Sequence, residues 1–146
     1  MMNLSKAVKI STALDYADGS TDRKGASLDM LGFEGAMIVV KFAAIATGAV
    51  ASVKVQQSAE DVDADFADLE GTAIAVADDD DNQVFIIDVY KPQKRFVRVY
   101  VDKDGANSTA EMAWYAQYEP REEPITQDVA DEVTHKLLVS PAEGVA

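Results

Sequence analysis

The chain of 146 residues is long enough for one domain with a buried core, and its 48% hydrophobic and 27% charged residues are typical of a soluble globular protein. The formal net charge of −13 argues against nucleic acid or an anionic membrane surface as a partner, because Lys and Arg provide the attraction to both. The chain has no cysteine, which excludes disulfides and thiolate metal sites.

The N-terminal region shows no basic and apolar leader, so we expect no secretory signal. Residues 4–10 alternate loosely between apolar and polar side chains, which predicts an arm or an edge strand. Residues 15–25 are polar and rich in turn-forming residues, which predicts a loop. Residues 1–25 are therefore predicted to form an N-terminal arm and loop ahead of the folded core.

The central part of the chain alternates apolar and polar residues with the period of two that is typical of strands. Residues 36–42 and 50–57 give strong strand patterns, and residues 27–30 and 72–76 give shorter or weaker ones. The longest apolar stretch, residues 36–51, contains polar residues and is too short to span a bilayer, so we expect no membrane partner.

Residues 83–102 give the clearest strand pattern, as two alternating runs joined by a Lys-Pro turn. The turn chemistry of residues 103–105 favours a hairpin between the strand of Arg98 and a last strong strand at residues 109–118. Alternation in that last strand places Trp114 on the apolar face, which predicts a core position in preference to a ligand platform.

The C-terminal region, residues 119–146, contains one helix candidate at residues 126–136 and a short strand candidate at residues 136–139. About seven to nine short strands at this spacing are typical of an antiparallel sandwich or jelly roll. We therefore predict a single all-β domain: an antiparallel β-sandwich, jelly-roll-like, with a β core at residues 26–118 and extended N- and C-terminal arms. The predicted core residues are Ile38, Val40, Val53, Val55, Phe85, Ile87, Val97, Val99, Met112 and Trp114.

Charge is distributed unevenly along the chain. Residues 58–90 contain eleven acids and no base, whereas residues 91–103 contain five bases and one acid. Solvated loops followed by a salt-bridged strand would explain this pattern. A basic strip that docks on an acidic protein partner would also explain it.

No combination of residues indicates catalysis or a bound cofactor, so we expect a binding protein and not an enzyme. The series Asp61, Asp63 and Asp65 has the spacing of calcium-loop acids, but Phe66 stands where such a loop needs glycine. The single histidine, His135, lacks neighbours for a metal site or a catalytic triad and is expected to be an ordinary, partly buried residue.

Four stretches resemble one family when they are taken together: residues 27–40 (SLDMLGFEGAMIVV), 52–71 (SVKVQQSAEDVDADFADLEG), 90–101 (YKPQKRFVRVYV) and 139–146 (VSPAEGVA). In combination they are similar to small tailed-bacteriophage proteins encoded beside the major capsid protein, the head decoration or cement proteins. The resemblance implies a β-sandwich or jelly roll that binds the outside of an icosahedral shell, commonly as a trimer, and stabilises it by bridging neighbouring capsomers. The family has no catalytic motif.

The resemblance implies two partners, the major capsid protein and other copies of this chain as a homotrimer, on the exterior of a virion assembled in the bacterial host cytoplasm. We expect the contacts on the termini and on the basic strip. The candidate contact residues are Leu4, Lys6, Val8, Lys91, Lys94, Arg95 and Arg98. Two alternatives stay open: a phage neck or tail structural protein, and a carbohydrate-binding or host-attachment β module, which would need exposed aromatic side chains.

Overall fold

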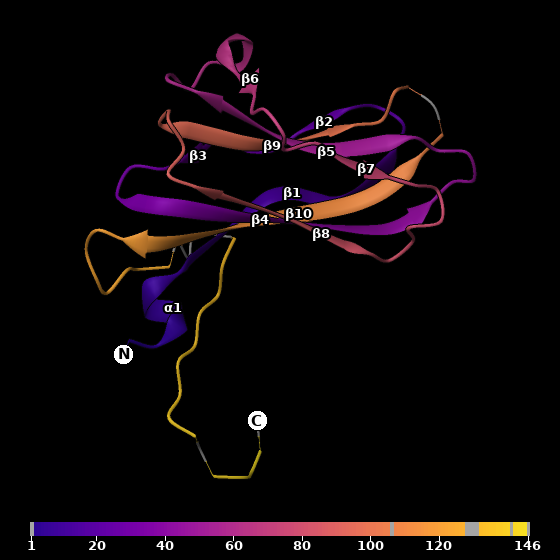
Figure 1. Cartoon of the computed structure of the whole chain (residues 1–146). Helices are drawn as coiled ribbons and strands as arrows, with labels where there is room; N and C mark the ends of the chain where they lie inside the picture. The colour runs from indigo at the N-terminus through magenta and orange to yellow at the C-terminus, as the bar shows by residue number, and fades with distance from the viewer. Residues whose placement is uncertain (1, 106, 128–131, 141, 146) are drawn as a thin grey trace.

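The computed structural model describes residues 2–105, 107–127, 132–140 and 142–145, and these residues fold as a β-sandwich (Figure 1). The strands are β1 (Lys9–Gly19), β2 (Arg23–Lys24), β3 (Leu28–Asp29), β4 (Phe33–Ile45), β5 (Ala51–Ser58), β6 (Ala67–Asp68), β7 (Ile74–Val76), β8 (Val84–Tyr90), β9 (Phe96–Asp102) and β10 (Thr109–Pro120). Helix in the described part of the chain is limited to the turn α1 (Leu4–Ala7) and the 3-10 turn η1 (Asp63–Asp65). The prediction of an all-β fold is confirmed.

The two sheets have the strand order of a jelly roll. Sheet A has the order β1-β10-β4-β8, and sheet B is built on β9 and β5, with β2 and β3 beside β9 and β6 and β7 beside β5. All of these strand pairs are antiparallel. If β2 with β3 and β6 with β7 each count as one interrupted edge strand, the orders are 1-8-3-6 and 2-7-4-5, which is the arrangement of an eight-stranded jelly roll.

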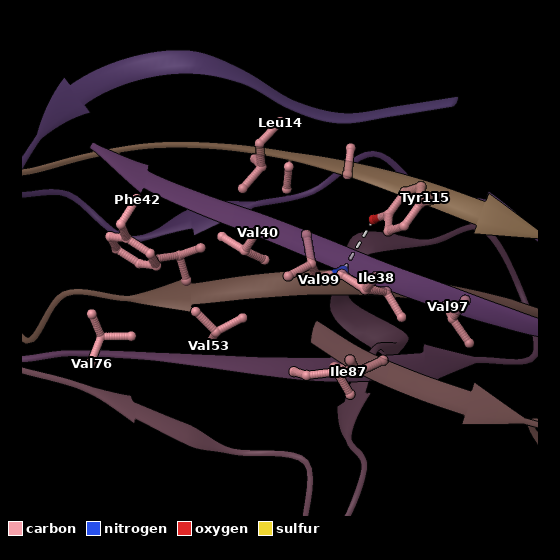
Figure 2. Packing of buried hydrophobic residues seen from close by; sticks show 14 of the residues in the cluster. Leu14, Ile38, Val40, Phe42, Val53, Val76, Ile87, Val97, Val99 and Tyr115 are labelled. Carbon is pink, nitrogen blue, oxygen red and sulfur yellow. Dashed lines mark hydrogen bonds between the residues drawn. The ribbon is translucent and has the colours of Figure 1, made fainter. Parts of the chain in front are cut away.

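The core lies between the sheets and is made by the alternating inner residues that the sequence predicts. Side chains of β4, β5 and β9 are completely buried there (Figure 2). These residues are Ile38, Val40 and Phe42 of β4, Val53 and Val55 of β5, and Val97, Val99 and Val101 of β9. On β8, Ile87 is buried, and Phe85 packs edge-on against Phe42 with 5.5 Å between ring centroids.

The predicted face of β10 is wrong. Met112 is exposed and Trp114 is partly exposed, because both lie on the outer face of sheet A. The inner face of β10 carries polar residues that each have a partner: Glu111 forms an ion pair with Lys103, and the Gln117 amide donates to the Asp29 carbonyl. A polar side chain can be buried when it is hydrogen-bonded, so the more apolar face of this strand was not the inner one.

Tyr115 on the same inner face connects the two sheets. Its hydroxyl accepts a hydrogen bond from the Val99 amide at 3.0 Å (Figure 2). The same hydroxyl donates one to the Ala26 carbonyl at 2.7 Å. Burial raises the pKa of Tyr115 above its usual range, so the phenol keeps its proton and remains a donor. A Cβ at Gly25 would lie 2.7 Å from this hydroxyl, which explains why glycine fits there.

Two predicted connections join different sheets and are not hairpins. β8 belongs to sheet A and β9 to sheet B, and the chain returns to sheet A at β10. The turn chemistry itself is present, since Lys91, Asp104 and Gly105 all have positive φ. A turn reverses the chain without specifying which sheet receives the next strand, so the predicted hairpin at residues 103–105 is wrong.

Both ends of the chain also differ from prediction. Residues 4–7 form a helical turn and β1 continues to Gly19, where a loop was expected. The pairing of β1 with β10 shifts register at two places, which hides the period of two in its sequence. The helix predicted at residues 126–136 is absent from the described residues of that range, with 128–131 outside them, and residues 136–139 do not form a strand.

Within the described ranges, every helix is too short and too polar to cross a membrane.

Candidate interaction surfaces

The outer face of sheet A is largely apolar, with Lys41 and Asp88 as the charged residues of β4 and β8 on it. Trp114 lies opposite Val39, which lies opposite Ile86, so three neighbouring strands place apolar side chains in one row across the sheet. Met112 is 40% exposed, Val84 49% and Ile86 53%, and Lys41 lies between Met112 and Val84. Antiparallel sheets with one solvated face normally carry polar residues on it, and a contiguous exposed apolar surface marks an interaction site.

The aromatic residues at one side of this face are held in place by acids. The rings of Tyr90 and Tyr118 stack, with 6.4 Å between centroids and 5° between planes. The Tyr118 hydroxyl donates to Asp88 at 2.6 Å, and the Tyr90 hydroxyl donates to Glu119 at 3.1 Å. Burial and the bond to Asp88 raise the pKa of Tyr118 above its usual range, so this hydroxyl stays protonated.

The outer face of sheet B is polar and is partly covered by the loop that contains η1. Arg98 is 6% exposed: its guanidinium donates to Gln56, forms an ion pair with Asp63 and lies 4.1 Å from the centroid of the Phe66 ring. Hydrogen bonds to Asp63 lower the pKa of its carboxyl; the bond from Lys24 has the larger effect and the bond from Arg98 the smaller one. Arg98 therefore belongs to a structural ion pair. The prediction that it lies on an accessible basic strip is wrong.

The other predicted contact residues of the basic strip, Lys91, Lys94 and Arg95, lie in the β8–β9 connection, on a groove of about 480 Å³ at one end of the sandwich. Lys91 and Lys94 are exposed there, beside the exposed Leu31. Arg95 forms a bidentate salt bridge with Asp29, with N–O distances of 2.9 and 2.7 Å, and its guanidinium lowers the pKa of the Asp29 carboxyl. The groove thus combines an apolar residue with basic side chains.

The predicted N-terminal contact residues lie in and next to α1. Leu4 is exposed, whereas Lys6 and Val8 are partly buried. The buried side chain of Gln127 donates to the Ser5 and Val8 carbonyls, at 2.9 and 2.7 Å, and accepts from the Ile10 amide at 3.1 Å. These bonds fasten the N-terminal segment to the start of the C-terminal one, so it is not a free extended arm.

The acidic stretches act as turn caps and ion-pair partners. Amides at Gly48, Ala77 and Ile45 donate to Asp78, Asp80 and Asp81, at 2.6, 2.8 and 2.8 Å. Across the described residues, no three His, Asp or Glu side chains are grouped to hold a metal ion.

His135 is exposed on the C-terminal segment, where a partly buried position was expected. The seven predicted contact residues are therefore distributed over three places: α1 with the start of β1, the groove, and the outer side of sheet B.

Sequence reasoning missed the apolar outer face of sheet A. Its clearest sign was β8, where Val84 and Ile86 on one face and Phe85 and Ile87 on the other are all apolar. A strand that is apolar on both faces is expected to be covered on both. To predict that Trp114 and Met112 lie on the outer face, the true register of β10 was also required.

Comparison with known proteins shows a shared fold. No protein-family model and no curated protein sequence matches this chain. The fold is similar to that in the crystal structure of the PBSX exported protein XepA, with a TM-score of 0.55 and 16% identity over 98% of this chain and 46% of that chain. The protein therefore spans less than half the length of XepA.

A weaker likeness, with a TM-score of 0.43 and 18% identity over 76% of this chain and 88% of the other, is to a structure of Bacillus endospore appendages, described as disulfide-linked pili. That score is too low to carry an argument. At these identities, the likeness to XepA shows the fold and nothing more.

Proposed function

We propose that this protein is a structural protein of a tailed-phage virion that binds the outer surface of the capsid and stabilises the shell by bridging subunits of the major capsid protein. It acts by binding alone, without a cofactor and without turnover of a substrate. The four sequence stretches that resemble decoration proteins support the phage origin. The fold shared with XepA, a phage PBSX protein, is compatible with it.

The observation that carries the proposal is the apolar outer face of sheet A. On this face Trp114 is partly exposed and Met112, Val84 and Ile86 are exposed, and an apolar surface of this kind is expected to be buried against another protein. A decoration protein has such a partner in the capsid surface. Basic side chains at the groove, Lys91 and Lys94, would then lie at the polar rim of the contact.

The charge of the chain fits a position outside the shell. A net charge of −13 keeps the protein away from packaged nucleic acid, which repels it. A chain without cysteine is suited to assembly in a reducing bacterial cytoplasm. A homotrimer would match the threefold axes of an icosahedral shell, because a closed ring has the symmetry of such an axis.

The proposal is tested by sedimenting the purified protein with shells of the major capsid protein from the same phage. Met112→Lys, on the outer face of sheet A, should lower the amount that sediments with the shells, because it places a charge in the contact. Val62→Lys is the matched control, since Val62 is 50% exposed in the loop that covers sheet B. Equal sedimentation of both variants and the parent protein would exclude this face, and no sedimentation of the parent protein would exclude the function.

The groove is tested separately by charge reversal. The double change Lys91→Glu with Lys94→Glu should lower the occupancy of the protein on the shells and change how this occupancy depends on salt. The reason is that exposed charges at the rim of an interface act through solvent, where salt screens them. Arg98 is unsuitable for this test, since its reversal would break a buried contact within the protein.

A second candidate function, glycan binding, is favoured by the outward position of Trp114. This side chain lies on the same face as the stacked Tyr90 and Tyr118, and exposed aromatic rings with nearby acids are suited to sugar rings. Trp114 is the only tryptophan, so its fluorescence reports on this face alone. A saturable change in that fluorescence on adding host surface oligosaccharides would support glycan binding, and no change would count against it.

A further inference from the structure

Three of the four sheet edges are protected against pairing with another chain. In sheet B, the edge strands β2, β3, β6 and β7 are only two or three residues long. In sheet A, β1 is long, but its pairing with β10 is interrupted by two register shifts. Short edge strands and β-bulges are the usual ways in which proteins block edge-to-edge association.

The fourth edge, β8, has neither form of protection. It pairs with β4 in an unbroken register from Gly35 opposite Tyr90 to Lys41 opposite Val84, and sheet A ends there. Its seven residues, VFIIDVY, include one charge, Asp88. A long, regular and apolar edge of this kind is expected to receive a further strand.

A strand-like segment without a partner is present in the same chain. Residues 136–139, Lys-Leu-Leu-Val, have the composition of a strand but form none, and Leu138 and Val139 are 57% and 95% exposed. The C-terminal segment leaves the sandwich on the side of sheet A and runs away from it (Figure 1). The segment therefore does not run along its own β8.

We propose that residues 136–139 of one copy add to β8 of a second copy as an antiparallel strand. In the register that places Leu138 opposite Ile86, Lys136 lies opposite Asp88 on the outer face. The same register places Leu137 opposite Ile87 and Val139 opposite Phe85, towards the core. It thus pairs opposite charges on one face and apolar side chains on both.

The geometry of the tail permits this exchange. Gln127 is fixed by its bonds to the N-terminal segment, and the nine residues from there to Lys136 can span roughly 30 Å when extended. Each copy has one donor segment and one acceptor edge, so the exchange links copies into a dimer, a closed ring or an open chain. It does not depend on capsid binding and is open to test in solution.

Cross-linking distinguishes exchange between copies from docking of the tail on its own sheet. The chain has no cysteine, so Ile86→Cys and Leu138→Cys can be made as separate full-length variants, mixed, and treated with a short bis-maleimide. The mixture should yield cross-linked dimers well above the yield of a control mixture of Val50→Cys with Leu138→Cys. Yields equal to the control would overturn the proposal, as would a double variant that cross-links only within one chain.

Charge exchange tests the register. Asp88→Lys and Lys136→Glu should each weaken self-association about fivefold in light scattering against concentration, because a cross-strand pair is worth up to about 1 kcal/mol. Asp88→Lys also removes the acceptor of the Tyr118 hydroxyl, so the double variant should recover most of the association that Asp88→Lys loses, and Asp61→Lys, on the sheet B side, should leave the parent value unchanged. A parent protein that is monomeric at every concentration, or a double variant no better than the weaker single one, would contradict the proposed pairing.

Discussion

Replacing Glu111 with leucine is expected to destabilise the fold more than replacing Lys103 with methionine, although the two side chains form one buried ion pair. The Lys103 Nζ lies 2.8 Å from the Glu111 Oε1, with side chains 1% and 0% exposed. Glu111 also pairs with Arg23 at 3.0 Å and accepts from the Thr109 hydroxyl at 2.8 Å. Loss of Glu111 leaves two cations without their carboxylate, whereas loss of Lys103 leaves Glu111 with both of its other partners.

The expected magnitudes follow from these partners. Removing one member of a buried ion pair costs about 3–5 kcal/mol, which is expected for Glu111→Leu. For Lys103→Met, the lost contacts are those of one charged donor, and about 1–3 kcal/mol is expected. Typical domains have a free energy of unfolding of about 5–15 kcal/mol, so the first change removes a large share of the stability.

Urea denaturation at neutral pH and fixed protein concentration measures these differences. With a slope of about 1–3 kcal/mol per molar urea, Glu111→Leu should lower the midpoint by more than 1 M. The double variant should lose less than the sum of the two single losses, because it leaves no lysine ammonium buried without its carboxylate. An equal or reversed order of the single variants, or a strictly additive double variant, would refute this account of the cluster.

Three further changes test other contacts. Tyr115→Phe should lower the free energy of unfolding by about 1–3 kcal/mol in the same assay, because two buried backbone groups lose their partner; no change would mean that the hydroxyl does not link the sheets. Gln127→Ala should speed hydrogen exchange at the Ile10 amide without changing far-ultraviolet circular dichroism, and unchanged exchange would contradict the fastening of the N-terminal segment. The lowered pKa of Asp63 means that the unfolded chain takes up its proton at higher pH than the folded one, so this carboxyl stabilises the fold above about pH 4 and ceases to do so as pH falls through its folded pKa. Melting temperatures measured from pH 5 to pH 2 should therefore fall less for Asp63→Asn than for the parent protein, and parallel curves would contradict this.

Much of the fold follows from local alternation. The inner positions of β4, β5, β8 and β9 were predicted correctly because each of these strands has a more apolar inner face. β10 reverses that rule, since its inner face holds Glu111 and Gln117, whose partners come from residues far away in the sequence. No local pattern contains those partners.

Pairing between distant strands also explains the other errors. The second half of β1, residues 15–19, was predicted as a loop because its polar residues and the register shifts hide the alternation, and only its pairing with β10 makes it a strand. The sheet that receives β9 or β10 depends on the jelly-roll topology and not on the turn before it. The same limit concealed the main candidate site, because the outer face of sheet A is assembled from β4, β8 and β10 only once their registers are known.

The central claim is tested most directly by a cryo-electron map of shells of the major capsid protein with the purified protein added. We expect added density on the outside of the shell, with the outer face of sheet A against the capsid surface and the polar face of sheet B turned to solvent. In a map of whole virions, density only at a neck or tail would assign the protein to another part of the virion. A shell that is identical with and without the protein, and that survives heat and osmotic shock equally well in both cases, would contradict the capsid-binding role.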